Sequence, residues 1–174
     1  TFLKKYAEYL MDQGLHIGIL ENDFGAINVD MLMLHELRGD QCELEMIAGG
    51  CDAESHRRRF RTKLISMRMC GYDRVLVEPS GIYDVDEFFD VLREEPLDQW
   101  YEIGNVIAIL DARLEKNLSQ QADYLLASEA ANAGKVILSH ADAATREQCE
   151  DTVAHLNLAL EQIRCDRRID PEKD

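Results

Sequence analysis

The stretch Arg74-Val-Leu-Val-Glu-Pro-Ser-Gly81 decides the fold class of this 174-residue chain. It opens with a short apolar run and becomes polar at Glu78. A run of this length without polar alternation is typical of a strand covered on both faces, as the strands of parallel sheets are. The sequence therefore predicts a buried strand that leads directly into a polar loop.

Similar runs recur along the chain, with helix-patterned segments between them. The other apolar runs of strand length cover residues 16–20, 42–47, 105–110 and 135–138. Apolar residues at helical spacing cover 2–13, 31–37, 53–69, 85–93, 118–133 and 145–163. Parallel strands need crossover connections, and each crossover helix buries one face of the sheet. This order predicts a three-layer α/β fold with a mostly parallel sheet, and we expect residues 1–174 to form a single domain.

The composition narrows the classes of partner. Acidic residues outnumber basic residues by 34 to 19, so the formal net charge is −15 and we expect no affinity for nucleic acid or anionic membrane. The longest apolar stretches are strand-length, far below the roughly 20 residues of a membrane span. Five cysteines without a CxxC pair lead us to expect reduced thiols and a cytoplasmic protein.

Carboxylates follow three of the predicted strands, where ligands bind in folds of this kind. Glu21 follows the first strand, Glu78 the third, and Asp142 the fifth. A carboxylate after a buried strand can hold Mg²⁺, and Gly81, three residues after Glu78, allows a backbone N–H to approach a terminal phosphate. Asp142 can accept two hydrogen bonds from the N1–H and N2–H₂ edge of guanine, which adenine lacks. A simpler interpretation is that strands end at the surface, where acidic residues are common.

The chain begins within a predicted helix. Apolar residues recur at helical spacing from Phe2 to Met11, and no capping box precedes them. We therefore expect further chain before Thr1.

These motifs together resemble the nucleotide-binding domain of the CobW/HypB/UreG family of P-loop metallochaperone GTPases, closest to its CobW branch. The resemblance covers nearly the whole chain. Asn22-Asp-Phe-Gly25 followed by Asp30 resembles the family's Asn-Glu-Phe-Gly signature and the Asp that follows it, and Glu78-Pro-Ser-Gly81 matches its Glu-x-Ser-Gly motif. Ser139-His-Ala-Asp142 is similar to the base-reading Asn-Lys-x-Asp motif but keeps only the acid.

The resemblance implies a P-loop NTPase-like fold whose first strand and phosphate loop would precede Thr1, itself a threonine of the family's Gly-Lys-Thr-Thr loop. It implies GTP and Mg²⁺ as ligands, and hydrolysis that gates metal or cofactor delivery to a client metalloenzyme. The resemblance also implies that Glu78 and Asp23 are catalytic residues, and that Glu21, Asp23 and Glu78 bind Mg²⁺. Nucleotide binding is assigned to Thr1, Gly81, Ser139 and Asp142. We expect this chain by itself to bind nucleotide poorly, to be inactive in hydrolysis and to form a homodimer.

A second group of candidate ligands follows the second predicted strand. The family's Gly-Cys-x-Cys-Cys motif corresponds to Gly50-Cys-Asp-Ala-Glu54, which keeps one thiolate. The resemblance makes Cys51 and Glu54 candidate ligands for Zn²⁺ or Ni²⁺ as cargo. The alternative is that Asp52 only caps the helix that follows.

Other interpretations stay open at this point. The altered base and thiolate motifs also fit a regulatory or interaction module that binds nucleotide without efficient hydrolysis, and the choice between GTP and ATP is open. A small-molecule enzyme on the same architecture has only fold analogy in its favour. The basic cluster 57–63 either contacts phosphates or a partner, or forms a solvated helix face. His16, His35 and His155 are interpreted as structural residues without a carboxylate at ligand spacing.

Overall fold

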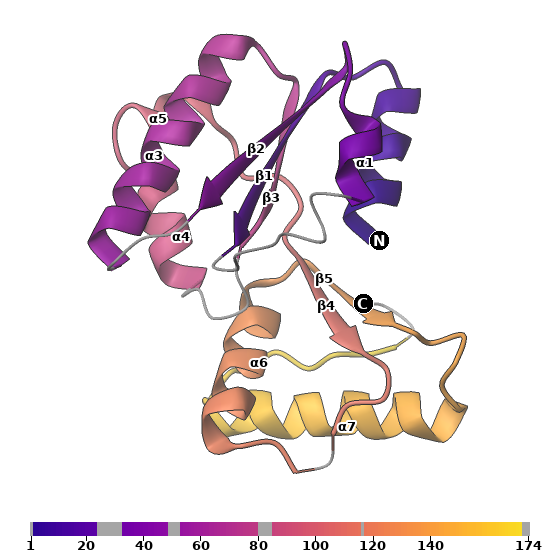
Figure 1. Ribbon diagram of the computed structural model, residues 1–174. Helices are drawn as coiled ribbons and strands as arrows, with labels where there is room; N and C mark the ends of the chain where they lie inside the picture. The colour runs from indigo at the N-terminus through magenta and orange to yellow at the C-terminus, as the bar shows by residue number, and fades with distance from the viewer. Residues whose placement is uncertain (1, 24–32, 49–52, 80–84, 116, 172–174) are drawn as a thin grey trace. The chain divides into compact units, whose positions relative to one another are not determined.

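The structure of the chain is a computed structural model that describes residues 2–23, 33–48, 53–79, 85–115 and 117–171. It contains two compact units, Thr1–Tyr101 and Glu102–Asp174, and each is described by itself (Figure 1). Both units are mixed α/β, with parallel strands and helices packed on the sheets. The predicted fold class is confirmed, while the single domain over residues 1–174 stays a prediction.

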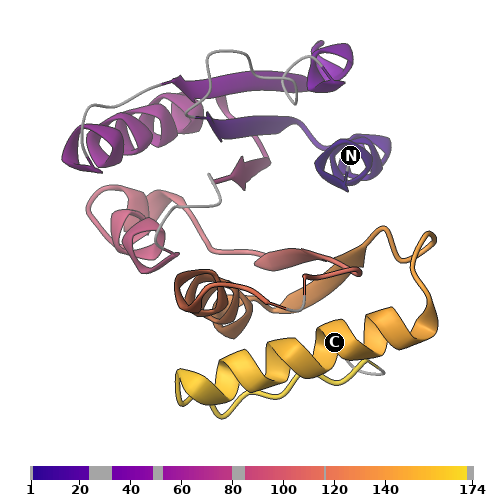
Figure 2. The same ribbon diagram turned by 60° about the horizontal axis from the view of Figure 1, so that its bottom comes forward.

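The first unit is a three-stranded parallel sheet with helices on both faces. The sheet order is β2-β1-β3, and the strands are β1 (Ile17–Asp23), β2 (Cys42–Ala48) and β3 (Arg74–Glu78). The helices are α1 (Phe2–Asp12), the short 3-10 helix η1 (His35–Leu37), α3 (Ala53–Cys70), α4 (Val85–Leu92) and α5 (Leu97–Trp100). Figures 1 and 2 show α1 and α3 on opposite sides of the strands.

Alternation along β1 explains the two helical layers. Ile17 and Ile19 pack in the cluster that includes Ala7 and Leu10 of α1. Leu20, on the other face, packs in the cluster that includes residues of α3, α4 and α5. Both faces of the strand are therefore apolar, as the sequence predicts for a buried parallel strand.

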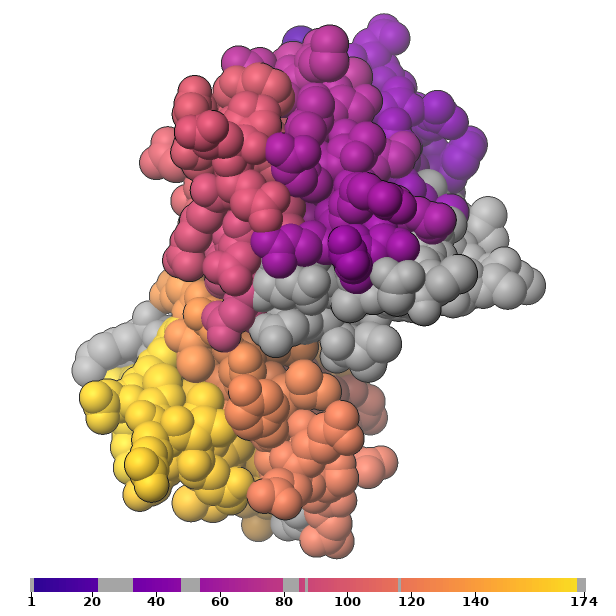
Figure 3. Space-filling view, turned by 90° about the vertical axis from the view of Figure 1, so that its left-hand side faces the viewer, coloured from indigo at the N-terminus to yellow at the C-terminus, as the bar shows by residue number. Residues whose placement is uncertain are grey.

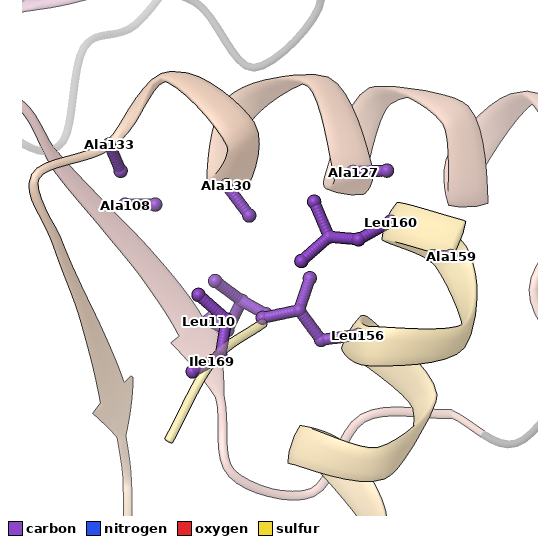
Figure 4. Close-up of a cluster of buried hydrophobic side chains, with 9 residues drawn as sticks. All are labelled: Ala108, Leu110, Ala127, Ala130, Ala133, Leu156, Ala159, Leu160 and Ile169. Carbon is purple, nitrogen blue, oxygen red and sulfur yellow. The ribbon is translucent and has the colours of Figure 1, made fainter. Parts of the chain in front are cut away.

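The second unit is a two-stranded parallel sheet with two long helices. Its elements are β4 (Ile107–Asp111), α6 (Gln120–Asn132), β5 (Lys135–Ser139) and α7 (Arg146–Gln162). Figure 4 shows Leu156 and Leu160 of α7 directed toward Leu110 of β4 and Ala127 of α6. A capping box between Thr145 and Gln148 fixes the start of α7.

Most predicted boundaries differ from the structure by one or two residues, and two differences change the description of an element. The sequence places the end of the first strand at Leu20, but β1 continues to Asp23. It continues because parallel pairing with β2 extends to Asp23 opposite Ala48. Glu21 is therefore a strand residue rather than a loop residue. The helix predicted over residues 31–37 ends, within the described chain, in the 3-10 turn η1.

Among the helices that the structure describes, none combines the length and the apolar character needed to cross a membrane.

Candidate functional site

Two glutamates lie side by side at the carboxyl edge of the first unit's sheet. Glu21 of β1 is paired in register with Glu78 of β3, and on its other side with Met46 of β2. Paired positions of adjacent strands lie about 4.8 Å apart, with side chains on the same face. The sheet order therefore brings together two carboxylates that are far apart in the sequence.

The glutamate row lies on the face of the sheet that α1 covers. Glu21 follows Ile17 and Ile19 at alternating positions of β1, and both isoleucines pack in the cluster that includes α1. Glu21 is buried, with 3% of its surface exposed, whereas Glu78 is exposed. One carboxylate is thus fixed within the protein, and its neighbour is accessible to a ligand.

The N-terminal end of α1 lies toward the same edge. A short connection joins the end of α1 to β1, so the helix runs antiparallel to the strand and starts near the strand's carboxyl end (Figure 1). Carboxylate oxygens are the ligands that Mg²⁺ prefers. Glu21 and Glu78, at the edge toward which the N-terminal end of α1 lies, therefore fit a magnesium ion.

Several predicted site residues lie outside the described residues. These are Thr1, Cys51 and Gly81, together with the side chain of Asp23, whose backbone ends β1. Glu54 is described and lies exposed in the first turn of α3. Within the described ranges, no group of three or more His, Cys, Asp or Glu residues could hold a metal ion.

The second unit has a polar network at its own carboxyl edge. His140, just after β5, places Nδ1 3.0 Å from Oδ2 of Asp111, the last residue of β4. The other oxygen of Asp111 accepts a hydrogen bond from the backbone N–H of Arg113 at 2.8 Å. Ser139, paired with Asp111 in register, donates its hydroxyl to the Leu110 carbonyl at 3.0 Å. The Ser139 hydroxyl is therefore engaged in a hydrogen bond with the neighbouring strand.

The segment after β5 is a tight turn that includes Asp142. His140 has a positive φ of 55°, which is uncommon for a residue with a Cβ. The backbone N–H of Ala143 closes the turn on the His140 carbonyl at 3.0 Å. Asp142 is exposed in this turn. His140 and Asp142 therefore lie in one short turn beyond the end of a parallel strand.

Sequence reasoning missed Asp111. The signal was present, because Asp111 directly follows the apolar run 105–110, as Glu78 follows its own run. Its partner, His140, could not be identified because the two residues are 29 positions apart and meet only through the pairing of β4 with β5.

His16 and His155 each have a carboxylate partner, but neither partner is near in the sequence. Nε2 of His155 in α7 lies 2.7 Å from Oδ1 of Asp123 in α6, and Nδ1 of His16 lies 3.7 Å from Oδ2 of Asp73. Both carboxylates are distant in sequence and come near through the packing of separate segments. The His155 pair joins the two helices of the second unit, which agrees with a structural role.

The basic cluster on α3 is engaged within the chain. Arg57 and Arg61 both pair with Glu94, and Arg61 also donates to the Glu95 carbonyl at 2.6 Å. Lys63 pairs with Glu45 of β2. Figure 3 shows α3 beside the segment that includes α4 and α5. Arg57 and Arg61 connect α3 to this segment, because Glu94 and Glu95 lie between α4 and α5. The contacts favour a structural role for much of this cluster.

Parallel strands, helices on the sheets and polar groups at the carboxyl edges define a protein of the P-loop NTPase-like α/β class. Comparison with protein families identifies the family: the model of the CobW/HypB/UreG nucleotide-binding domain matches residues 1–169. The chain belongs to this family.

Two relatives are zinc chaperones of Escherichia coli strain K12. The chain is 26% identical to the zinc chaperone YjiA over 157 residues, which cover 83% of this chain and 46% of YjiA. It is 28% identical to the zinc chaperone YeiR over 123 residues, which cover 67% of this chain and 37% of YeiR. The chain thus spans less than half the length of either relative. No solved structure matches it significantly.

Proposed function

We propose that this chain is the GTP-binding and GTP-hydrolysing part of a protein that delivers a metal or cofactor to a client metalloenzyme. The observation that carries the proposal is the pairing of Glu21 with Glu78 on the face covered by α1. Family membership over residues 1–169 supports it, because the family is a nucleotide-binding one.

The phosphates are assigned to the carboxyl edge of the first unit. Thr1, which precedes α1, binds phosphate oxygens, and the backbone of Gly81 contacts the γ-phosphate. Glu21, Asp23 and Glu78 hold Mg²⁺, which when bound neutralises charge on the β- and γ-phosphates. Glu78 and Asp23 orient the attacking water through hydrogen bonds. Exposure of the Glu78 side chain supports this role, because a water-orienting group must reach the ligand.

The base is assigned to the turn after β5. Asp142 accepts two hydrogen bonds from the guanine edge, and Ser139, at the start of the same segment, is the other nucleotide-binding residue proposed there. Loss of the Asn and Lys of the family motif makes weak selection between GTP and ATP an expected property of this chain.

The cargo is proposed to be Zn²⁺ or Ni²⁺ bound by Cys51 and Glu54. Both relatives, YjiA and YeiR, are zinc chaperones, which supports Zn²⁺ as the first metal to test. The alternative is that Asp52 caps α3 and that no metal binds at this point.

Hydrolysis of GTP and ATP by the full-length protein tests the proposal. We expect Mg²⁺-dependent release of phosphate, and we expect Glu78→Gln to reduce kcat by at least about 100-fold because it removes a charge that acts in the transition state. Glu43→Gln is the matched control: Glu43 lies in the same sheet, but on the opposite face and nearer the amino ends of the strands. Failure to bind either nucleotide would remove the GTPase assignment.

The altered turn Ser139-His-Ala-Asp142 favours one second candidate, a regulatory or interaction module that binds nucleotide without efficient turnover. In the same assay this module would bind GTP or ATP with Mg²⁺ and release almost no phosphate. Turnover comparable to that of active GTPases would exclude it.

Competition titration of Zn²⁺ and Ni²⁺ against a chromophoric chelator tests the cargo site. Cys51→Ser is expected to weaken metal affinity at least about tenfold, because the thiolate is the softest ligand of the set. The exposed Cys70→Ser is the control. An unchanged affinity in Cys51→Ser would show that the metal binds elsewhere.

A further inference from the structure

We propose that the outer face of α3 is a docking surface for the client metalloenzyme, and that the client segment bound there carries carboxylates beside an apolar side chain. The inference rests on the proposed function for the identity of the partner, and it adds the surface that binds the partner. It is carried by Arg58 and Arg68, two exposed arginines for which the described residues supply no carboxylate, on the same helix as the highly exposed Met69.

The charge of α3 is opposite to the charge of the chain as a whole. The helix has six basic residues and one acidic residue, whereas the whole chain has 34 acidic and 19 basic residues. Three of the six basic side chains pair with carboxylates of other segments, Arg57 and Arg61 with Glu94, and Lys63 with Glu45. Within the described part of the chain, Arg58 and Arg68 have no such partner, so positive charge remains on the surface of α3.

Helix stability does not account for Arg58. It lies between Arg57 and Arg59 and one turn before Arg61. Like charges one turn apart destabilise a helix, and the helix dipole favours basic residues near the C-terminal end rather than at this position. Arg68 does lie in the last turn of α3, where the dipole favours it. Arg58 is therefore the residue whose charge most clearly calls for an external partner.

Arg58 shares its face of α3 with apolar side chains. Arg58, Thr62, Ile65 and Met69 recur at spacings of three and four residues, so they lie along one side of the helix. The buried residues of α3 lie on the opposite side, and they are His56, Phe60, Leu64 and Met67. Met69 is 82% exposed and Ile65 is partly exposed. Arginine and methionine are enriched in protein–protein interfaces, so this face has the composition of a protein-binding surface.

The net charge of the chain narrows the kind of partner. At −15 the protein repels nucleic acid and anionic membranes, which are densely and extensively charged. A protein segment with a few carboxylates is repelled far less, and pairing with Arg58 and Arg68 favours it over short distances. An apolar side chain of the same segment covers Met69. The surface therefore fits a protein segment that is acidic only locally.

The start of the same helix carries a residue proposed to bind the cargo. Glu54 lies in the first turn of α3, and Arg58 follows it by one turn on the same side of the helix. A client docked on this face is therefore close to Glu54, which suits a protein that delivers a metal to that client.

Fluorescence anisotropy of the full-length protein with two short labelled peptides tests the surface. The first peptide is composed of Glu, Leu and Ala, and the second has Gln in place of every Glu. The Glu peptide is expected to bind at least about tenfold more tightly than the Gln peptide at low salt. This difference should shrink as the ionic strength rises toward about 1 M, because salt screens exposed charges. The titrations contain no nucleotide and so do not depend on GTP hydrolysis.

Variants of α3 locate the binding. Arg58→Ala combined with Arg68→Ala is expected to weaken the Glu peptide at least about tenfold, and Met69→Ser about threefold. Arg146→Ala combined with Arg168→Ala is the matched control, because it removes the same charge from exposed side chains of the second unit. The control should bind the Glu peptide as the wild type does. Circular dichroism confirms that each variant is folded.

Four results overturn the inference. The first two are failure to bind the Glu peptide and equal affinity for the two peptides. The third is an unchanged affinity in the double variant of α3. The fourth is displacement of the Glu peptide by a single-stranded oligonucleotide at the same concentration as by unlabelled peptide, which assigns the surface to nucleic acid.

Light scattering of the full-length protein tests a second copy as the occupant of this face. A mass that falls from dimer to monomer when Arg58 and Arg68 are replaced shows that a second copy occupies the face, and it overturns the assignment to a client. An equal mass in both proteins supports the assignment. Peptide binding by a protein that neither binds nor hydrolyses GTP leaves the surface in place while the proposed function fails.

Discussion

Glu21 and Glu78 are neighbours in the sheet but have opposite relations to solvent. Glu21 is buried at 3% exposure, so its carboxylate is constrained by packing. Glu78 ends its strand and is exposed, so its carboxylate lies at the surface of the same edge. Carboxylate oxygens are preferred ligands of divalent cations, and this pair places two of these groups on neighbouring strands.

Thiol reactivity provides a first test at the residue scale. Cys42 is buried in β2 and burial raises the pKa of its thiol, whereas Cys70 is exposed at the end of α3. We expect Cys70 to react with a disulfide reagent at pH 8 at least about 100-fold faster than Cys42, because only an accessible thiolate attacks. Mass spectrometry of labelled peptides measures both rates. Equal rates in the native protein would contradict the packing around β2, while labelling in denaturant should be uniform.

The hydroxyl of Tyr101 provides a second test. It donates to the Leu64 carbonyl at 2.7 Å, and burial raises the pKa of Tyr101 to about 12. We expect Tyr101→Phe to lower the free energy of unfolding by about 1 kcal/mol in urea titrations at pH 7. The pKa of Tyr101 in the folded protein lies above the unfolded value of about 10. The Tyr101 hydroxyl therefore contributes its full share to the free energy of unfolding below pH 10, and this share is lost as the pH rises toward 12. Tyr101→Phe should therefore lose less stability over that range than the wild type.

At the scale of elements, β1 meets α3 more closely than a side chain on Gly18 would allow. A Cβ at Gly18 would lie 2.4 Å from Cε of Met67 and 2.8 Å from Cδ2 of Tyr72. Met67 is buried in the cluster that β1 shares with α3, so little free space is available. The position of α3 over the sheet therefore depends on a residue without a side chain.

We expect Gly18→Ala to destabilise the protein by about 1–3 kcal/mol, the usual cost of overpacking a core. Gly39→Ala is the control in the same unit, since a Cβ there meets nothing within 4 Å. Urea titration measures both variants. A loss in Gly18→Ala no larger than in Gly39→Ala would show that α3 can move away from β1, and partial recovery in Gly18→Ala with Met67→Ala would confirm the clash.

The elements also show what the sequence could predict and what it could not. Periodicity located all five described strands, because buried strands are short apolar runs with polar ends. It ended β1 too early, because Glu21 is polar and only pairing with β2 extends the strand past it. Glu78 was found from its own strand, but its pairing with Glu21 depends on the order β2-β1-β3. Register between distant strands is a tertiary property, which local patterns do not encode.

At the scale of the whole molecule, the sheet of each unit, taken by itself, has unpaired edge strands within the described residues. There, β3 pairs with β1 alone and β4 with β5 alone. Unpaired edges offer backbone groups to another chain, and Ile109 of β4 is 47% exposed. We therefore expect residues 1–174, produced as a separate protein, to form a homodimer. Light scattering measures the mass, and a monodisperse monomer at micromolar concentration would reject this prediction.

The central claim is that Glu78, beside Glu21, binds Mg²⁺ together with a nucleoside triphosphate. The most direct measurement is the affinity of the full-length protein for a non-hydrolysable GTP analogue, with and without Mg²⁺, in the wild type, Glu78→Gln and the control Glu43→Gln. We predict that Mg²⁺ tightens binding at least about tenfold in the wild type and in Glu43→Gln, and has almost no effect in Glu78→Gln, because a carboxamide is a much weaker ligand for this ion than a carboxylate. An equal Mg²⁺ effect in all three proteins would contradict the claim.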